Sequence, residues 1–153
     1  MTVWRIVKAR FAASAFDGEG ARRSGGRWNT PGSRAVYTSA TAALAALEML
    51  VHLGRAASLP SYVLIACSFH ERFLMRLDRT LLPTDWRSYP APPGLQSIGD
   101  QWLRSGASLA LEVPSALIET ESNYLLNPEH PRFHSLTIAR PVPFELDVRL
   151  LKG

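Results

Sequence analysis

Short apolar runs along the chain predict a set of strands. They lie at residues 3–7, 35–38, 62–69, 73–77, 109–113, 136–138 and 144–151. Runs of this length, bounded by turn-forming residues, are typical of strands. They do not alternate regularly with helices, so the pattern indicates an α+β domain with a mixed or antiparallel β core and few helices, rather than a doubly wound parallel sheet.

Two segments have the composition of helices. Residues 42–53 are almost wholly Ala, Leu, Met and Val, follow the candidate N-caps Ser39 and Thr41, and precede Gly54, which predicts a helix that ends there. Because this segment is apolar all round, we expect the helix to be buried in the core. A second helix is predicted at residues 93–104.

Three further segments are predicted to lack regular structure. Residues 9–34 are rich in Gly, Arg, Ser and Asn. A connection of that length in a compact domain is usually functional or disordered, and its aromatic and arginine side chains favour a function. Residues 83–93 are proline-rich and predict a surface connection, and residues 123–131 are predicted to be turn-rich.

Length and composition indicate one ordinary globular domain spanning residues 1–153, with 46% hydrophobic and 20% charged residues. The single cysteine, Cys67, lies in an apolar run and cannot form an internal disulfide. Neither a signal peptide nor an apolar stretch long enough to cross a membrane is visible, so we expect a cytoplasmic protein with no membrane association.

The chain is basic, with a formal net charge of +4, and all but two of its cationic side chains are arginines. Arginine binds phosphate and carboxylate groups in a bidentate manner, so an anionic ligand is expected. The arginines are scattered rather than gathered in a run, which argues against nucleic acid as the direct partner. No metal site is expected, because Pro131 separates His130 from His134 and no third ligand is in reach.

Glu48 is the first candidate for chemistry. It is the only acid between Glu19 and Glu71, and it stands in the apolar segment 42–53. An unpaired buried carboxylate costs much free energy, so it is retained there for a partner or for a function. The alternative is an acid that points into solvent or pairs with an arginine.

Three other positions have suitable side chains for a ligand site. In Gly25-Gly26-Arg27-Trp28-Asn29, two glycines permit close approach of a ligand to the backbone, and Arg27 suits a phosphate or carboxylate. The ring of Tyr37 could stack on a planar ligand. Ser115 directly follows Pro114, a position that is typical of turns and caps. Taken singly, these residues are equally explained by a tight turn, strand packing and a cap.

In this order along the chain, Arg27, Tyr37, Glu48 and Ser115 resemble the RES domain, a family named for its arginine, glutamate and serine. The resemblance also includes four further stretches of the chain: Trp4-Arg5-Ile6, residues 16–21, Asn127-Pro128 and residues 144–151. The resemblance implies a fold similar to that of ADP-ribosyltransferase toxins. It also implies an NAD⁺-consuming enzyme that is the toxin of a type II toxin–antitoxin pair.

By the same resemblance, Glu48 and Arg27 are the catalytic residues, and Arg27, Tyr37 and Ser115 bind NAD⁺. In that assignment NAD⁺ is the substrate and no cofactor is needed. Glu48 stabilises positive charge on the ribose, Arg27 holds the pyrophosphate or a ribose, Tyr37 stacks on nicotinamide, and Ser115 bonds the amide or ribose.

The resemblance further implies an Xre-type helix-turn-helix antitoxin that covers the pocket, with a toxin dimer within the complex as one option and the stoichiometry left open. Asn123 and Asn127 are additional pocket-lining candidates outside the catalytic set. The acceptor of ADP-ribose stays open between water, phosphate and a protein side chain. A non-catalytic module that binds an acidic partner is the alternative of another class. The proline-rich residues 83–93 are a lid, an antitoxin contact or a plain connection.

Overall fold

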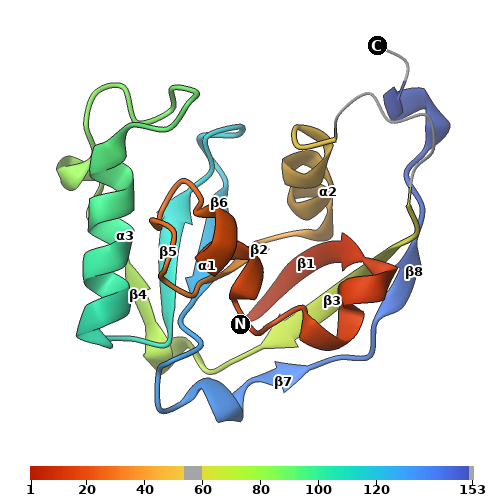
Figure 1. The fold of residues 1–153 in the computed structure, drawn as a ribbon, viewed down its shortest axis with the longest axis horizontal. Coiled ribbons are helices and arrows are strands. Elements are labelled where there is room, and N and C mark those ends of the chain that lie inside the picture. Colours follow the sequence, from red (N-terminus) through yellow and green to blue (C-terminus); the bar gives the residue numbers. More distant parts are fainter. Residues whose placement is uncertain (54–59, 152–153) are drawn as a thin grey trace.

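The computed structural model describes residues 1–53 and 60–151, and in this part of the chain eight strands form one sheet (Figure 1). The strands are β1 (Thr2–Lys8), β2 (Val36–Ser39), β3 (Tyr62–Ser68), β4 (Leu74–Arg76), β5 (Ala110–Pro114), β6 (Ser122–Leu126), β7 (Thr137–Ile138) and β8 (Val142–Phe144). Their order is β4-β5-β6-β2-β1-β3-β7, with β8 also paired to β3. The β4–β5 pair is parallel and the other pairs are antiparallel. The expected α+β class with a mixed sheet is confirmed.

The helices lie around this sheet. They are α1 (Glu19–Ser24), α2 (Ala42–Leu50) and α3 (Pro93–Ser105), with short 3₁₀ turns η1 (Ala9–Ser14), η2 (Glu71–Phe73), η3 (Arg79–Leu81), η4 (Phe133–Ser135) and η5 (Val148–Leu151). Figure 1 shows α3 beside the β4–β5–β6 part of the sheet, whereas α2 stands on the side of β1. In the described residues, no helix has both the length and the apolar character needed to cross a bilayer.

Two apolar clusters form the core, one on each face of the β5–β6 region. On β6, Tyr124 and Leu126 belong to the cluster that contains Val3 and Ile65, whereas Leu125 belongs to the cluster beneath α3. Successive side chains of a strand point to opposite faces, so this strand is buried on both sides. The cluster beneath α3 includes Trp28, which anchors the irregular N-terminal segment to the core.

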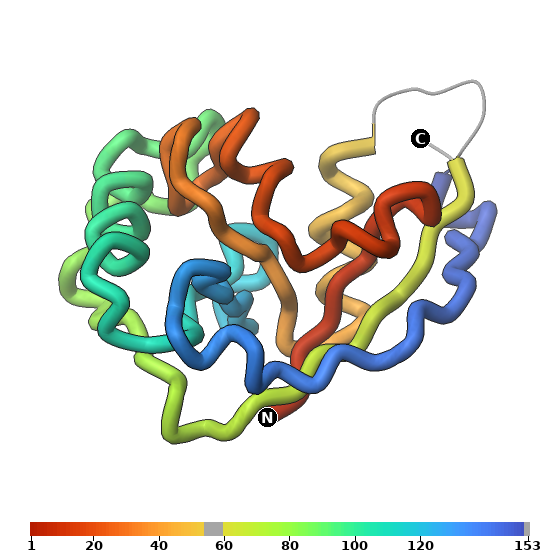
Figure 2. The backbone as a smooth tube through the Cα atoms, turned by 60° about the horizontal axis from the view of Figure 1, so that its bottom comes forward, coloured from red at the N-terminus to blue at the C-terminus, as the bar shows by residue number. Residues whose placement is uncertain are grey.

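The sheet nearly divides between β1 and β2. These two strands are in register at a single pair, Trp4 and Ser39, whereas β1 is paired to β3 along its whole length. Figure 2 shows the C-terminal segment that carries β7 and β8 running alongside β3, where both strands pair. The two parts of the sheet therefore diverge beyond Trp4, and space opens between them.

The helix predicted at residues 42–53 is α2, which ends at Leu50. Thr41 is its N-cap, since the Thr41 hydroxyl accepts a hydrogen bond from the Leu44 amide at 3.0 Å. The predicted stop at Gly54 lies outside the described residues. The expectation that this helix is buried all round is wrong, because only Leu44 and Ala45 are buried and Val51, just after it, is 56% exposed. The helix packs one face on β1 and β2 and leaves the other partly open.

Three other predictions need correction. Residues 9–34 are not wholly irregular, since they contain η1 and α1. The predicted turn-rich stretch 123–131 begins within β6, a central strand. Of the predicted strand 144–151, only Phe144 lies in a strand, as the last residue of β8, and η5 follows it. Phe144 pairs with Tyr62, the first residue of β3, so the chain beyond it runs past the end of its partner strand.

Candidate functional site

The carboxylate of Glu48 is held by two side chains from the sheet. Its Oε1 accepts hydrogen bonds from the Ser115 hydroxyl at 2.9 Å and from the Asn123 side-chain amide at 2.6 Å. Hydrogen bonds that favour the ionised form stabilise a carboxylate in a partly buried position. Both bonds reach the same oxygen, which leaves Oε2 available to a ligand. Glu48 thus has partners, but neither of them is a cation.

Ser115 lies beneath Glu48 and is 0% exposed. It follows β5, and its Oγ accepts hydrogen bonds from the Leu117 and Ile118 amides at 3.1 and 3.2 Å while donating to Glu48. The single hydroxyl proton is therefore committed to the carboxylate. These contacts favour a positioning role for Ser115 over the direct contact with the ligand expected from the sequence.

Asn123, held outside the catalytic set on sequence grounds, is the second residue that orients Glu48. Its Oδ1 accepts a hydrogen bond from the Ser39 hydroxyl at 2.8 Å, which fixes the amide so that Nδ2 points to the carboxylate. Asn127 has a different place: it is buried, donates to the Leu103 carbonyl and is not part of this cluster. We refer to Ser39, Glu48, Ser115 and Asn123 as the carboxylate cluster.

The loop formed by residues 25–29 is shaped by glycine and by Tyr37. Gly25 has a φ of 69°, and a Cβ at Gly26 would lie 2.6 Å from the Tyr37 hydroxyl. That hydroxyl donates to Asn29 Oδ1 at 2.7 Å and accepts from the Trp28 amide at 3.1 Å. Burial raises the pKa of Tyr37, so the phenol keeps its proton. Gly26 is thus required because the tyrosine packs directly against the loop, whereas Gly25 is required by its positive φ.

Helix α3 supports the same loop from behind. The side-chain amide of Gln96 donates to the carbonyls of Gly26 and Asn29 at 3.0 and 3.1 Å. Asp100 accepts from the amide and hydroxyl of Thr30, the latter at 2.6 Å. Gly99 lies between them, and a Cβ there would meet the Trp28 carbonyl oxygen at 1.7 Å. The loop that carries Arg27 therefore has a rigid base.

Arg27 extends from this loop toward the proline-rich segment, residues 83–93. Its Nη1 donates to the carbonyls of Trp86 at 2.8 Å and Ser88 at 3.2 Å. Partial burial lowers the pKa of Arg27, while the charge of the Glu48 carboxylate opposes the shift. One nitrogen of the guanidinium is used by the protein, and the others are available to an anion. The predicted arginine therefore also fastens one wall of the site.

Arg5 on β1 is a candidate that the sequence reasoning passed over. Its Nη1 donates to the Tyr37 carbonyl at 2.7 Å, across the point where β1 and β2 diverge, and its Nε is buried with no hydrogen-bond partner among residues 1–53 and 60–151. Burial lowers the pKa of Arg5 to about 10, against an opposing effect of Asp17. The guanidinium remains charged at neutral pH. An arginine inside an otherwise apolar strand, Val3 to Val7, was the available signal.

These residues surround one cavity of about 940 Å³. Its lining comes from β1, β2, α2, the 25–29 loop, the proline-rich segment and the turn after β5. The charged lining residues are Arg5, Arg27, Arg87 and Glu48, so cationic groups outnumber the single carboxylate. A cavity of this size accommodates a ligand as large as a dinucleotide. Of the four sequence-predicted residues, Arg27, Tyr37 and Glu48 line it, and Ser115 lies directly behind.

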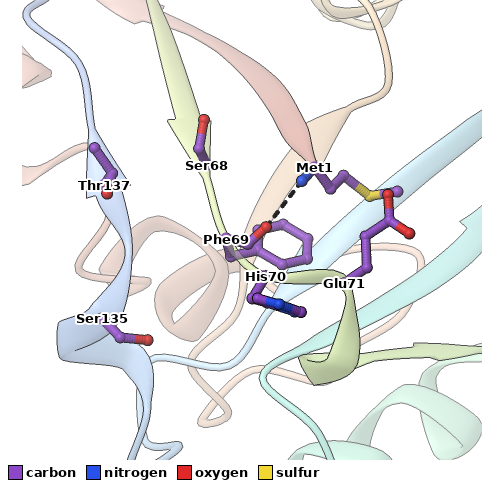
Figure 3. Close-up of a pocket in the computed structure, with 7 residues that line it drawn as sticks. All are labelled: Met1, Ser68, Phe69, His70, Glu71, Ser135 and Thr137. Atoms are coloured by element: carbon purple, nitrogen blue, oxygen red, sulfur yellow. Dashed lines mark hydrogen bonds between the residues drawn. The ribbon is translucent and has the colours of Figure 1, made fainter.

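A second, smaller hollow lies at the other end of β1. Figure 3 shows its seven lining residues, where the Met1 amine donates to the Phe69 carbonyl at 2.9 Å. None of the sequence-predicted site residues lines it. The chemistry suggested by the sequence is therefore gathered in the larger cavity.

The chain is similar to known proteins over nearly its whole length. The family profile described as RES domain matches residues 2–147. A protein named Toxin Res from Yersinia enterocolitica is 42% identical over 98% of this chain and 99% of its own. A protein named Prs ADP-ribosylating toxin from Sphingobium is 32% identical over 97% of this chain and 96% of its own.

The fold also matches a solved structure. A chain in the crystal structure of the M. tuberculosis MbcT-MbcA toxin-antitoxin complex superposes with a TM-score of 0.76, at 23% sequence identity, over 94% of this chain and 83% of that one. At that identity the match establishes the fold. Together with the profile and the full-length relatives, it shows that the chain belongs to the RES-domain family.

Proposed function

We propose that this protein is the toxin of a toxin–antitoxin pair and that it consumes NAD⁺ by breaking the bond between nicotinamide and ribose. The observation that carries the proposal is the carboxylate cluster: Glu48 is oriented by Ser115 and Asn123 in a cavity whose other charged lining groups are arginines. Full-length relatives named as toxins support the biological role.

The carboxylate suits the transition state of this reaction. As the C1′–N bond breaks, its electron pair leaves with nicotinamide, which departs as a neutral molecule, and positive charge develops on the ribose. A fixed carboxylate beside the sugar stabilises that charge. The oxygen of the acceptor then bonds to C1′ and loses its proton. Glu48 Oε2 is the group placed to orient a water or other acceptor, and no strong general acid is needed.

The arginines suit the rest of the substrate. The pyrophosphate of NAD⁺ is anionic, and the guanidinium groups of Arg27 and Arg5 offer charge-assisted hydrogen bonds to it. The ring of Tyr37, whose hydroxyl is engaged by the 25–29 loop, lines the cavity and offers a surface for nicotinamide. An arginine-rich cavity with one oriented acid is harder to explain in a module that only binds an acidic partner.

Transfer of ADP-ribose to a protein is the second candidate. It is favoured by the Sphingobium relative, whose name describes an ADP-ribosylating toxin. The same carboxylate and cavity serve both reactions, and the two differ only in the acceptor. We further propose an antitoxin partner, of the Xre type, that covers the cavity, because the matched solved structure is a toxin bound to its antitoxin.

The test is incubation of the purified protein with NAD⁺, with and without phosphate and with bacterial lysate. Free ADP-ribose indicates hydrolysis, its phosphate ester indicates phosphorolysis, and labelled protein indicates transfer. We expect Glu48→Gln to reduce turnover by a factor on the order of a thousand, as for loss of one group that stabilises transition-state charge. Glu145→Gln, which changes an exposed acid outside the cavity lining, is the matched control and retains activity. Unchanged NAD⁺ in every condition with folded wild-type protein refutes the proposal.

A further inference from the structure

The proline-rich segment, residues 83–93, is fastened to the cavity from two sides. From one side Arg27 donates to the carbonyls of Trp86 and Ser88. From the other, Arg87 of the segment donates to the Ala116 carbonyl at 3.1 Å and to the Glu119 carboxylate at 3.3 Å. Internal hydrogen bonds, such as that from the Ser88 amide to the Asp85 carbonyl at 2.8 Å, add to this. The segment is thus a fixed wall rather than a plain surface connection.

This wall carries an uncovered aromatic residue at the cavity. Tyr89 is 88% exposed, yet it lines the cavity together with Pro90. A single exposed aromatic is ordinary on a protein surface. Tyr89 differs because its neighbour Ser88 is held by Arg27, so the backbone that carries the ring is anchored to the site. An aromatic face with little protein packed on it is available to stack on a planar ring.

Arg27 is linked on one side to Glu48 and on the other to the segment that carries Tyr89, and all three residues line the cavity. Glu48 and Arg27 line the same cavity, and the Glu48 carboxylate opposes the lowering of the Arg27 pKa. Arg27 in turn contacts the Ser88 carbonyl, next to Tyr89. A dinucleotide has its reacting ribose, its pyrophosphate and its second nucleoside in the same order. With the ribose at Glu48 and the pyrophosphate at Arg27, the second ring reaches Tyr89.

We infer that Tyr89 and Pro90 form the subsite for the adenine ring of the substrate. This inference rests on the proposed function and adds the part of the protein that recognises the non-reacting half of NAD⁺. It predicts that the enzyme distinguishes the dinucleotide from nicotinamide mononucleotide, which carries the reacting ribose but lacks the adenine. It also gives the proline-rich segment a role in substrate selection.

The test is direct binding in the Glu48→Gln background, which is expected to bind without consuming the ligand. Dissociation constants are measured by calorimetry for ADP-ribose and for nicotinamide mononucleotide. We expect Tyr89→Ala to weaken ADP-ribose binding about ten-fold, as for the loss of one base–aromatic stack, and to leave the mononucleotide unchanged. Tyr89→Phe keeps the ring and restores the affinity. Phe11→Ala removes another exposed aromatic, outside the cavity lining, and changes neither value.

Two results overturn the inference. Equal affinities of Tyr89→Ala and its parent for ADP-ribose exclude a ring contact, and a concurrent loss of antitoxin binding assigns Tyr89 to a protein interface instead. Equal losses for both ligands indicate a general disturbance of the site. In either case NAD⁺ turnover by the wild-type protein still stands, which separates this failure from failure of the proposed function, where the wild-type protein leaves NAD⁺ intact.

Discussion

Glu48 illustrates how far a single residue can be understood without coordinates. Its isolation in an apolar segment indicated a role, because a carboxylate in such surroundings costs free energy unless something compensates. Its partners could not be named in advance, since Ser115 and Asn123 lie 67 and 75 residues away along the chain. Asn123 was therefore left out of the predicted catalytic set, and Ser115 was assigned to the ligand rather than to the carboxylate.

Arg5 offers a test of whether a buried charge is kept for function. Its lowered pKa, about 10, shows that the folded protein disfavours the charged form relative to an exposed arginine. Below pH 10 the side chain is protonated in both the folded and the unfolded chain, so this cost applies in full at neutral pH and is relieved only as the pH rises through about 10. We expect Arg5→Met to keep or raise the Tm at pH 7 and to lower NAD⁺ affinity.

The measurement is thermal unfolding of both proteins at pH 7, together with the KM for NAD⁺. Arg76→Met is a suitable control, since Arg76 is an exposed arginine that pairs with Glu112 away from the cavity. A clear fall in Tm for Arg5→Met with an unchanged KM would mean that Arg5 serves only to join β1 to the Tyr37 carbonyl.

Among the secondary-structure elements, α3 was predicted with nearly correct bounds, 93–104 against Pro93–Ser105. Its function was not predicted. Gln96, Gly99 and Asp100 lie at helical spacing, and all three act on the loop or the residue that follows it. Helix α3 thus sets the position of Arg27, although Gln96 is its only residue in the cavity lining.

The two glycines of α3 provide a matched pair of substitutions. A methyl group at Gly99 meets the Trp28 backbone at 1.7 Å, whereas at Gly94 it meets nothing within 4 Å. We expect Gly99→Ala to destabilise the protein by about 3 kcal/mol and to lower turnover, because the loop that carries Arg27 must move. Gly94→Ala is expected to be neutral or stabilising by up to about 1 kcal/mol.

Urea denaturation and NAD⁺ turnover of the two variants check this pair of expectations. Equal stability and activity of Gly99→Ala and Gly94→Ala would show that α3 does not position the loop.

One predicted turn region and one predicted strand were wrong because of how the strands pair in the sheet. Residues 123–131 were predicted to be turn-rich, but their first part is a strand because β2 and β5 supply partners on both of its edges. The alternating residues after Phe144 suggest a strand, but β3 ends opposite that position and leaves their backbone without a partner. Intrinsic strand preference is weak compared with the availability of a paired edge.

In the molecule as a whole, the cavity lies where the sheet nearly divides. The single register pair between β1 and β2, supplemented by the Arg5 contact, links the two parts of the sheet in front of the carboxylate cluster. A ligand bound there contacts both parts. Binding is therefore expected to stabilise the fold as well as to fill the site.

Thermal unfolding of Glu48→Gln with added NAD⁺ measures that coupling. At a ligand concentration of 100 times Kd, a ligand that binds only the folded state stabilises it by about 2.7 kcal/mol. For a protein of this size, that corresponds to a rise in Tm on the order of 5 to 10 °C. A second substitution, Arg27→Ala, is expected to reduce the rise at the same NAD⁺ concentration. An unchanged Tm at millimolar NAD⁺ would mean that the folded protein does not bind the dinucleotide, which would contradict the proposed substrate.

Local chemistry along the chain was enough to predict the α+β class, a helix capped by Ser39 or Thr41, the α3 helix and membership of the RES-domain family, and to select Glu48 as a candidate. These features depend on side-chain pattern, capping and order, which a short stretch of sequence contains. Folding was needed to bring Ser115 and Asn123 onto Glu48, to place Arg5 in the cavity, and to turn residues 83–93 into a wall held by Arg27. Those contacts join segments that are distant in the chain, and they arise from strand pairing and packing that no local pattern specifies.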